Sequence, residues 1–81
     1  MLILYVRDGC AGCEKAKSDS RGVKTVDVTP GAPGAMDARA DLMSWLSNAD
    51  LDLDTPLPIL VDDETGLVQT QDEHGNWRRT L

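Results

Sequence analysis

The chain has 81 residues, which is enough for one small domain over residues 1–81 but leaves room for only a modest core. Fourteen acidic and eight basic side chains give a net charge of −6, which argues against nucleic acid or an anionic membrane as a partner, since both require basic surface. No apolar run approaches a membrane span and no secretory signal pattern is visible, so the expected compartment is the cytoplasm.

The chain opens with an uninterrupted apolar run, residues 2–6, which is typical of a central strand covered on both faces. A polar turn over residues 7–9 follows, with glycine at position 9. Residues 11 to about 20 then form a short, weakly amphipathic helix in this prediction, because only Ala11, Cys13 and Ala16 are apolar.

The only two cysteines, Cys10 and Cys13, lie at the start of that helix with Cys-x-x-Cys spacing. Closing so short a loop removes little freedom from the unfolded chain, so the pair suits chemistry better than stabilisation. Free amides and the positive end of a helix favour a thiolate, which is the reactive form. The pattern predicts Cys10 as nucleophile and Cys13 as its resolving partner. In the cytoplasm such a disulfide is transient and catalytic rather than structural.

The middle of the chain predicts an edge strand and a better helix. Residues 23–28 alternate apolar and polar side chains, and the strand–helix–strand path indicates a right-handed crossover between parallel neighbours. After a proline- and glycine-rich loop, residues 35 to about 49 place apolar side chains at three- and four-residue steps. Trp45 lies on this stripe and is assigned to the core.

The last third predicts a hairpin. The acid-rich residues 50–54 read as a connection, and Pro58 opens a strand of about residues 58–62. Residues 62–66 form a turn, residues 67–71 return as an antiparallel strand, and residues 77–81 add a short extra strand. The fold class is therefore α/β, with a mixed sheet of about four strands in the order β-α-β-α-β-β.

This order resembles the glutaredoxins and small thioredoxin-like proteins, and particular residues match. Arg7 stands three residues before Cys10, where glutaredoxins have a basic residue, and Ala16-Lys17 follows Cys13 as it commonly does there. Pro56-Leu57-Pro58, followed by Ile-Leu-Val, looks like the family segment that ends in a cis proline beside the cysteines.

The resemblance implies a thioredoxin-like fold and a function in thiol–disulfide exchange. The cis proline would be Pro58, and Leu57 would pair its backbone with an extended substrate. Arg7 would hold a substrate carboxylate or stabilise the thiolate. The predicted enzyme reduces protein or small-molecule disulfides through Cys10 and Cys13, with no bound cofactor and with glutathione or a thioredoxin-reductase-type system as electron donor. It is expected to be a monomer or weak dimer.

The chain also departs from that family. Ala11-Gly12 replaces the usual Pro-Tyr, and the Gly-Gly and following Asp that hold glutathione are not recognisable after the hairpin. The family's last helix is absent too, which leaves one side of the sheet under-covered. We expect the hairpin around Trp77 to fold over that side, or a second protein or subunit to cover it.

Two alternatives stay open on sequence. A Cys-x-x-Cys pair is half of a zinc site, with His74 as a third ligand and Asp, Glu or a second subunit completing it. The fold can also serve as a redox-sensing or binding module with little turnover, since a fold does not determine a function.

Overall fold

The computed structural model describes residues 1–19, 22–71, 74 and 76–79. This part of the chain forms one mixed sheet and two helices. In order they are β1 (Leu2–Val6), α1 (Ala11–Asp19), β2 (Lys24–Asp27), α2 (Ala35–Asn48), β3 (Ile59–Asp62), β4 (Val68–Gln71) and β5 (Trp77–Arg79). The predicted element order is confirmed, and the ends differ by a residue or two; residues 20, 80 and 81 lie outside the described part.

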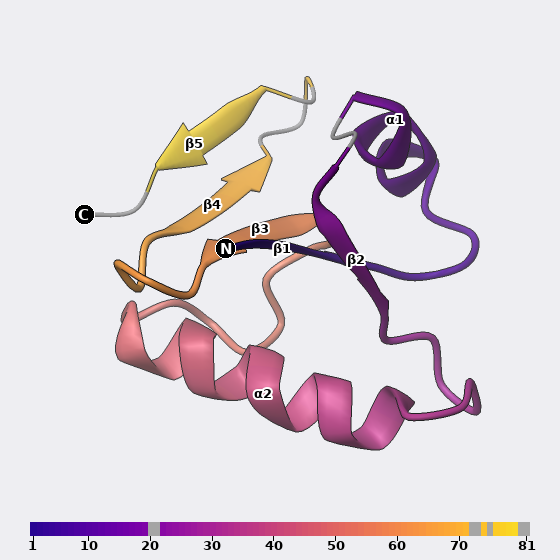
Figure 1. Ribbon diagram of the computed structural model, residues 1–81, viewed down its shortest axis with the longest axis horizontal. Helices are drawn as coiled ribbons and strands as arrows, with labels where there is room; N and C mark the ends of the chain where they lie inside the picture. Colours follow the sequence, from indigo (N-terminus) through magenta and orange to yellow (C-terminus); the bar gives the residue numbers. More distant parts are fainter. Residues whose placement is uncertain (20–21, 72–73, 75, 80–81) are drawn as a thin grey trace.

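The sheet has five strands rather than about four, in the order β2-β1-β3-β4-β5. β1 runs parallel to β2 and antiparallel to β3, and β3, β4 and β5 are successively antiparallel. β1 is therefore an interior strand and β2 an edge strand, as the sequence predicts. Figure 1 shows α1 and α2 on opposite faces of the sheet. Neither described helix is long and apolar enough to cross a membrane.

The larger core lies between α2 and the sheet. Its buried side chains come from β1, β3, β4, the helix α2 and the residue after β2: Tyr5, Val28, Leu42, Leu46, Ile59, Val61 and Val68. Trp45 is half-buried against this cluster, which agrees with its assignment to the core. Burial, followed by the charge of Asp41, raises the pKa of Tyr5, and Trp45 partly offsets this rise. The amphipathic stripe of α2 thus buries one face of the sheet.

A smaller core lies between α1 and the other face. Leu4 and Val6 of β1 point to this side, where they pack on Cys13 and Ala16 of α1, with all four side chains almost fully buried. Because a strand alternates its side chains, β1 supplies Tyr5 to one core and its two neighbours to the other. The uninterrupted apolar run of β1 is explained by this two-sided burial.

The C-terminal hairpin widens the sheet instead of folding over it. β5 pairs with β4, with Trp77 opposite Gln71, and so extends the sheet at its edge. The Trp77 side chain is half-buried and packs against the smaller core beside α1. β5 is the short extra strand that the sequence predicts, and it extends the sheet while Trp77 covers part of the face beside α1. Cover of this face by a second protein or subunit stays a prediction.

Candidate functional site

The loop between β1 and α1 is tied to the end of β2. The Asp8 amide donates to Thr29 Oγ1 at 2.8 Å, and the Thr29 amide donates to Asp27 Oδ1 at 2.8 Å. The Thr29 hydroxyl also donates to Asp27, and these bonds, with the hydroxyl first, hold the pKa of the Asp27 carboxyl below its ordinary value. Gly9 has a φ of 76°, a left-handed conformation that glycine adopts without strain. The turn that leads into Cys10 is therefore fixed by the hydrogen bond from Asp8 to Thr29 and by the left-handed conformation of Gly9.

Cys10 caps α1. Its carbonyl accepts the first helical bonds, from the Cys13 amide at 3.1 Å and the Glu14 amide at 3.4 Å. Its Sγ also accepts from the Cys13 amide, at 3.2 Å, as the oxygen of a capping serine or aspartate would. In the reduced protein this amide and the positive helix end stabilise negative charge on the Cys10 sulfur.

The two cysteines form a disulfide, with Cα atoms 5.2 Å apart. They differ sharply in exposure: Cys13 is 0% exposed and Cys10 is half-buried. An incoming thiol or disulfide therefore meets Cys10 first. Cys10 is thus the outer sulfur and Cys13 the inner one, and their roles as attacking and resolving thiols stay predictions.

Leu57 and Pro58 lie directly beside the disulfide, although they are far from it in sequence. The Leu57–Pro58 peptide bond is cis, the isomer that the resemblance implies, and Pro58 is buried. The Leu57 carbonyl oxygen lies 3.5 Å from Cys10 Sγ. Sequence reasoning thus named the segment that contacts the outer sulfur.

Arg7 is exposed and lines a small pocket that ends at Leu57. The pocket has a volume of about 100 Å³ and an apolar floor, and its other lining residues are Val28, Pro30, Arg39, Leu42 and Met43. Two basic residues, Arg7 and Arg39, therefore line the space next to the residue that contacts Cys10. Sequence reasoning missed Arg39, because nothing in the sequence of α2 indicates which of its turns faces the Arg7 loop.

On the side of β4, Gln71 approaches the cysteine turn. A Cβ placed on Gly12 would be 3.1 Å from Gln71 Oε1 and 3.3 Å from Pro58 Cδ. The Gln71 side chain is half-buried, and its strand partner Trp77 packs against the core that contains Cys13. Gln71 was not predicted as a site residue, and its polar type in a short strand carries no signal that would have marked it.

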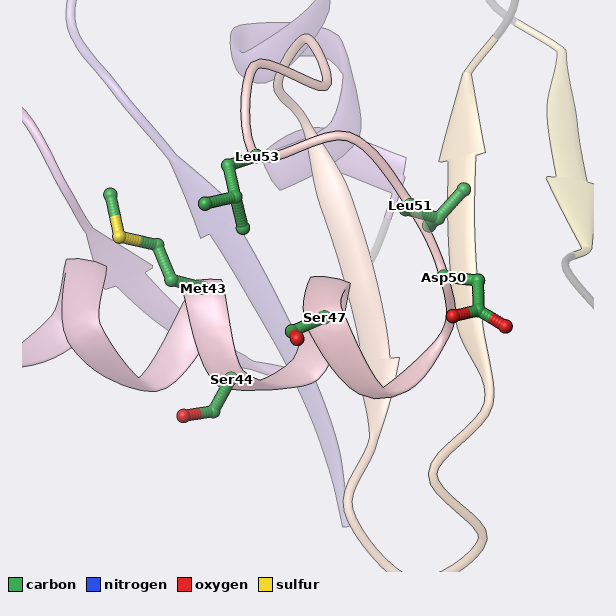
Figure 2. Close-up of a pocket in the computed structure, with 6 residues that line it drawn as sticks. All are labelled: Met43, Ser44, Ser47, Asp50, Leu51 and Leu53. Atoms are coloured by element: carbon green, nitrogen blue, oxygen red, sulfur yellow. The ribbon is translucent and has the colours of Figure 1, made fainter.

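A wide, open hollow lies elsewhere, between α2 and the connection that follows it. It has a volume of about 570 Å³, and Figure 2 shows its lining residues: Met43, Ser44 and Ser47 on the helix, and Asp50, Leu51 and Leu53 on the connection. No cysteine, cation or histidine lines it. Its two serines have no histidine or lysine among the lining residues to activate them, so we assign the chemistry to the disulfide site.

The described part of the chain contains no cluster of side chains that could hold a metal ion. No three His, Cys, Asp or Glu side chains come together there, and His74 lies exposed in the turn before β5. A structural zinc site needs four such ligands. The disulfide also occupies both sulfurs that the zinc alternative requires.

Comparison with known proteins found no matching family model, curated protein or solved structure. The function is therefore inferred from the geometry around Cys10 and Cys13.

The hydrogen bonds that join Thr29 to Asp8 and Asp27, which we call the Thr29 network, predict a pH-dependent stability. Because the pKa of folded Asp27 is lowered, its ionised form stabilises the fold above the ordinary Asp pKa of about 3.9, and this contribution is lost as the pH falls through the folded pKa. We expect Thr29→Val to lower the urea midpoint at about pH 6, and the difference from wild type to shrink by about pH 2.5.

Thr25→Val, on the exposed face of the same edge strand, is the matched control and should change little at either pH. Titration of the Asp27 carboxyl by NMR should show its pKa returning upward in Thr29→Val. A midpoint difference that stays constant with pH, or an unchanged Asp27 pKa, would contradict the network.

Proposed function

We propose that this protein is a thiol–disulfide oxidoreductase with a thioredoxin-like, glutaredoxin-type fold, which reduces protein or small-molecule disulfides in the cytoplasm. The observation that carries the proposal is a disulfide between the half-buried, helix-capping Cys10 and the fully buried Cys13, with the Leu57 carbonyl 3.5 Å from the outer sulfur. The β-α-β-α-β-β path and the cis Leu57–Pro58 bond support the fold assignment.

The first step begins from the reduced protein. Cys10 thiolate attacks one sulfur of a substrate disulfide, a bond forms between that sulfur and Cys10 Sγ, and the other substrate sulfur leaves as a thiolate that takes up a proton. The Cys13 amide, which lies 3.2 Å from Cys10 Sγ, stabilises the attacking anion. Leu57 presents backbone groups beside the new bond, so an extended substrate can pair with them in the manner of an added strand.

The second step closes the cycle on the protein. Cys13 loses its proton and attacks Cys10 Sγ, which releases the remaining substrate half as a thiolate and regenerates the Cys10–Cys13 disulfide. Two electrons pass from the dithiol to the substrate. The protein is reduced again by a thiol donor, either glutathione, two molecules of which become glutathione disulfide, or a thioredoxin-reductase-type flavoprotein.

The cationic pocket beside Leu57 supports a preference for substrates with a carboxylate near the disulfide. Arg7 and Arg39 come from different elements and line the same small space. Their guanidinium groups suit carboxylates, which they bind with two parallel hydrogen bonds. The chain as a whole has a net charge of −6, so two cationic residues that line one small space are opposite in sign to the overall charge.

Turnover of a model disulfide tests the activity. We expect wild type to reduce bis(2-hydroxyethyl) disulfide with glutathione or with a thioredoxin-reductase-type system, and Cys10→Ser to fall to the rate of the uncatalysed reaction because the nucleophile is gone. Cys13→Ser keeps the nucleophile and should accumulate a mixed disulfide on Cys10, seen by mass spectrometry. A folded wild type that is inactive with both donors would favour the binding-module alternative and overturn the proposal.

Charge selectivity tests the pocket. We expect Arg39→Gln to raise the KM for dithiodiglycolate, a dicarboxylate, by up to about fivefold, the size of an exposed ion pair, and to leave the neutral hydroxyethyl disulfide unchanged. The effect should weaken as salt is added. Lys24→Gln, which removes an exposed cation on β2, is the control. Equal changes for both substrates would show that Arg39 does not contact a carboxylate.

A further inference from the structure

Gly12 has no backbone reason to be glycine. It lies in the first turn of α1, its φ is outside the left-handed region, and glycine costs a helix about 1 kcal/mol relative to alanine. What glycine permits is the close approach of Gln71 Oε1 and Pro58 Cδ, which would lie 3.1 Å and 3.3 Å from a Cβ at this position. The turn between the cysteines is thus open on the side where the Gln71 amide lies.

The Gln71 amide is held beside the turn between the cysteines, and the described hydrogen bonds of the fold do not use it. Gln71 ends β4, and its strand partner Trp77 packs on the core that contains Cys13, which fixes the strand end beside α1. Among the described residues, the Gln71 side-chain amide has no hydrogen-bond partner. A half-buried amide in this position keeps one acceptor and two donor hydrogens available for an incoming molecule.

We infer that Gln71 is a specificity-determining residue that hydrogen-bonds the peptide backbone of a polypeptide disulfide, next to Gly12 and Pro58 at the turn between the cysteines. This inference rests on the proposed oxidoreductase function. A peptide group carries one donor and one acceptor, which a primary amide can match. An extended chain bound beside Cys10 can pair with the Leu57 backbone and, next to Pro58, can also reach the Gln71 amide. A disulfide without peptide groups gains nothing from Gln71.

The experiment compares two uncharged substrates in wild type, Gln71→Leu and the control Gln69→Leu. One substrate is the disulfide of an end-blocked, uncharged cysteine peptide, and the other is bis(2-hydroxyethyl) disulfide. Gln69 lies on the same strand and the same face, two positions from the disulfide end. We expect Gln71→Leu to lower kcat/KM for the peptide by about two- to tenfold, the loss of one hydrogen bond, with the small disulfide within about twofold. Gln69→Leu should change neither value.

The outcomes separate this inference from the proposed function. An equal fall for both substrates in Gln71→Leu would show that the residue only supports the cysteine turn, and no change for either would show that it does not contact substrate. Both results overturn the inference while leaving an active wild type and the proposed function intact. A wild type inactive on both substrates overturns the function itself. Gln71→Ala, which also lacks the amide, gives the same comparison if leucine disturbs the fold.

Discussion

The hydrogen bond from the Cys13 amide to Cys10 Sγ is the contact on which the rest of the site depends. It makes the outer sulfur the cap of α1, so the free donors of a helix start are directed at the atom that must carry negative charge. The cap stays in place because Leu4 and Val6 pack directly on Cys13 and Ala16. Burial of β1 on both faces therefore produces both the stability of the sheet and the position of the sulfur.

Two groups of residues border this cap. The Leu57 carbonyl lies against Cys10 Sγ, and Leu57 borders the pocket that Arg7 and Arg39 line. Next to Pro58, the β4–β5 hairpin brings Gln71 to Gly12, while Trp77 covers part of the smaller core. The interior strand β4 thus contributes the Gln71 amide to the site, and the edge strand β5 contributes apolar cover through Trp77. Charge selection is assigned to the pocket lined by Arg7 and Arg39, and backbone recognition to Gln71.

Local patterns in the sequence predicted the elements and the reactive pair. The apolar run of β1, the periodic stripe of α2 and the Cys-x-x-Cys spacing each report burial or chemistry within a few residues. The Leu57–Pro58 segment came from resemblance. Arg39 and Gln71 were not predicted, because their nearness to the site depends on how α2 and β4 pack against loops distant in sequence. Strand ends shifted by a residue or two because caps and turns decide them.

The most direct test of the central claim is the site of alkylation in the fully reduced wild-type protein. The protein is treated briefly at neutral pH with less than one equivalent of iodoacetamide, and the labelled cysteine is identified by peptide mass spectrometry. The half-buried, helix-capping Cys10 should carry the label while Cys13, which is 0% exposed, stays free. Label found mainly on Cys13, or shared equally, would contradict the assignment of Cys10 as the nucleophile.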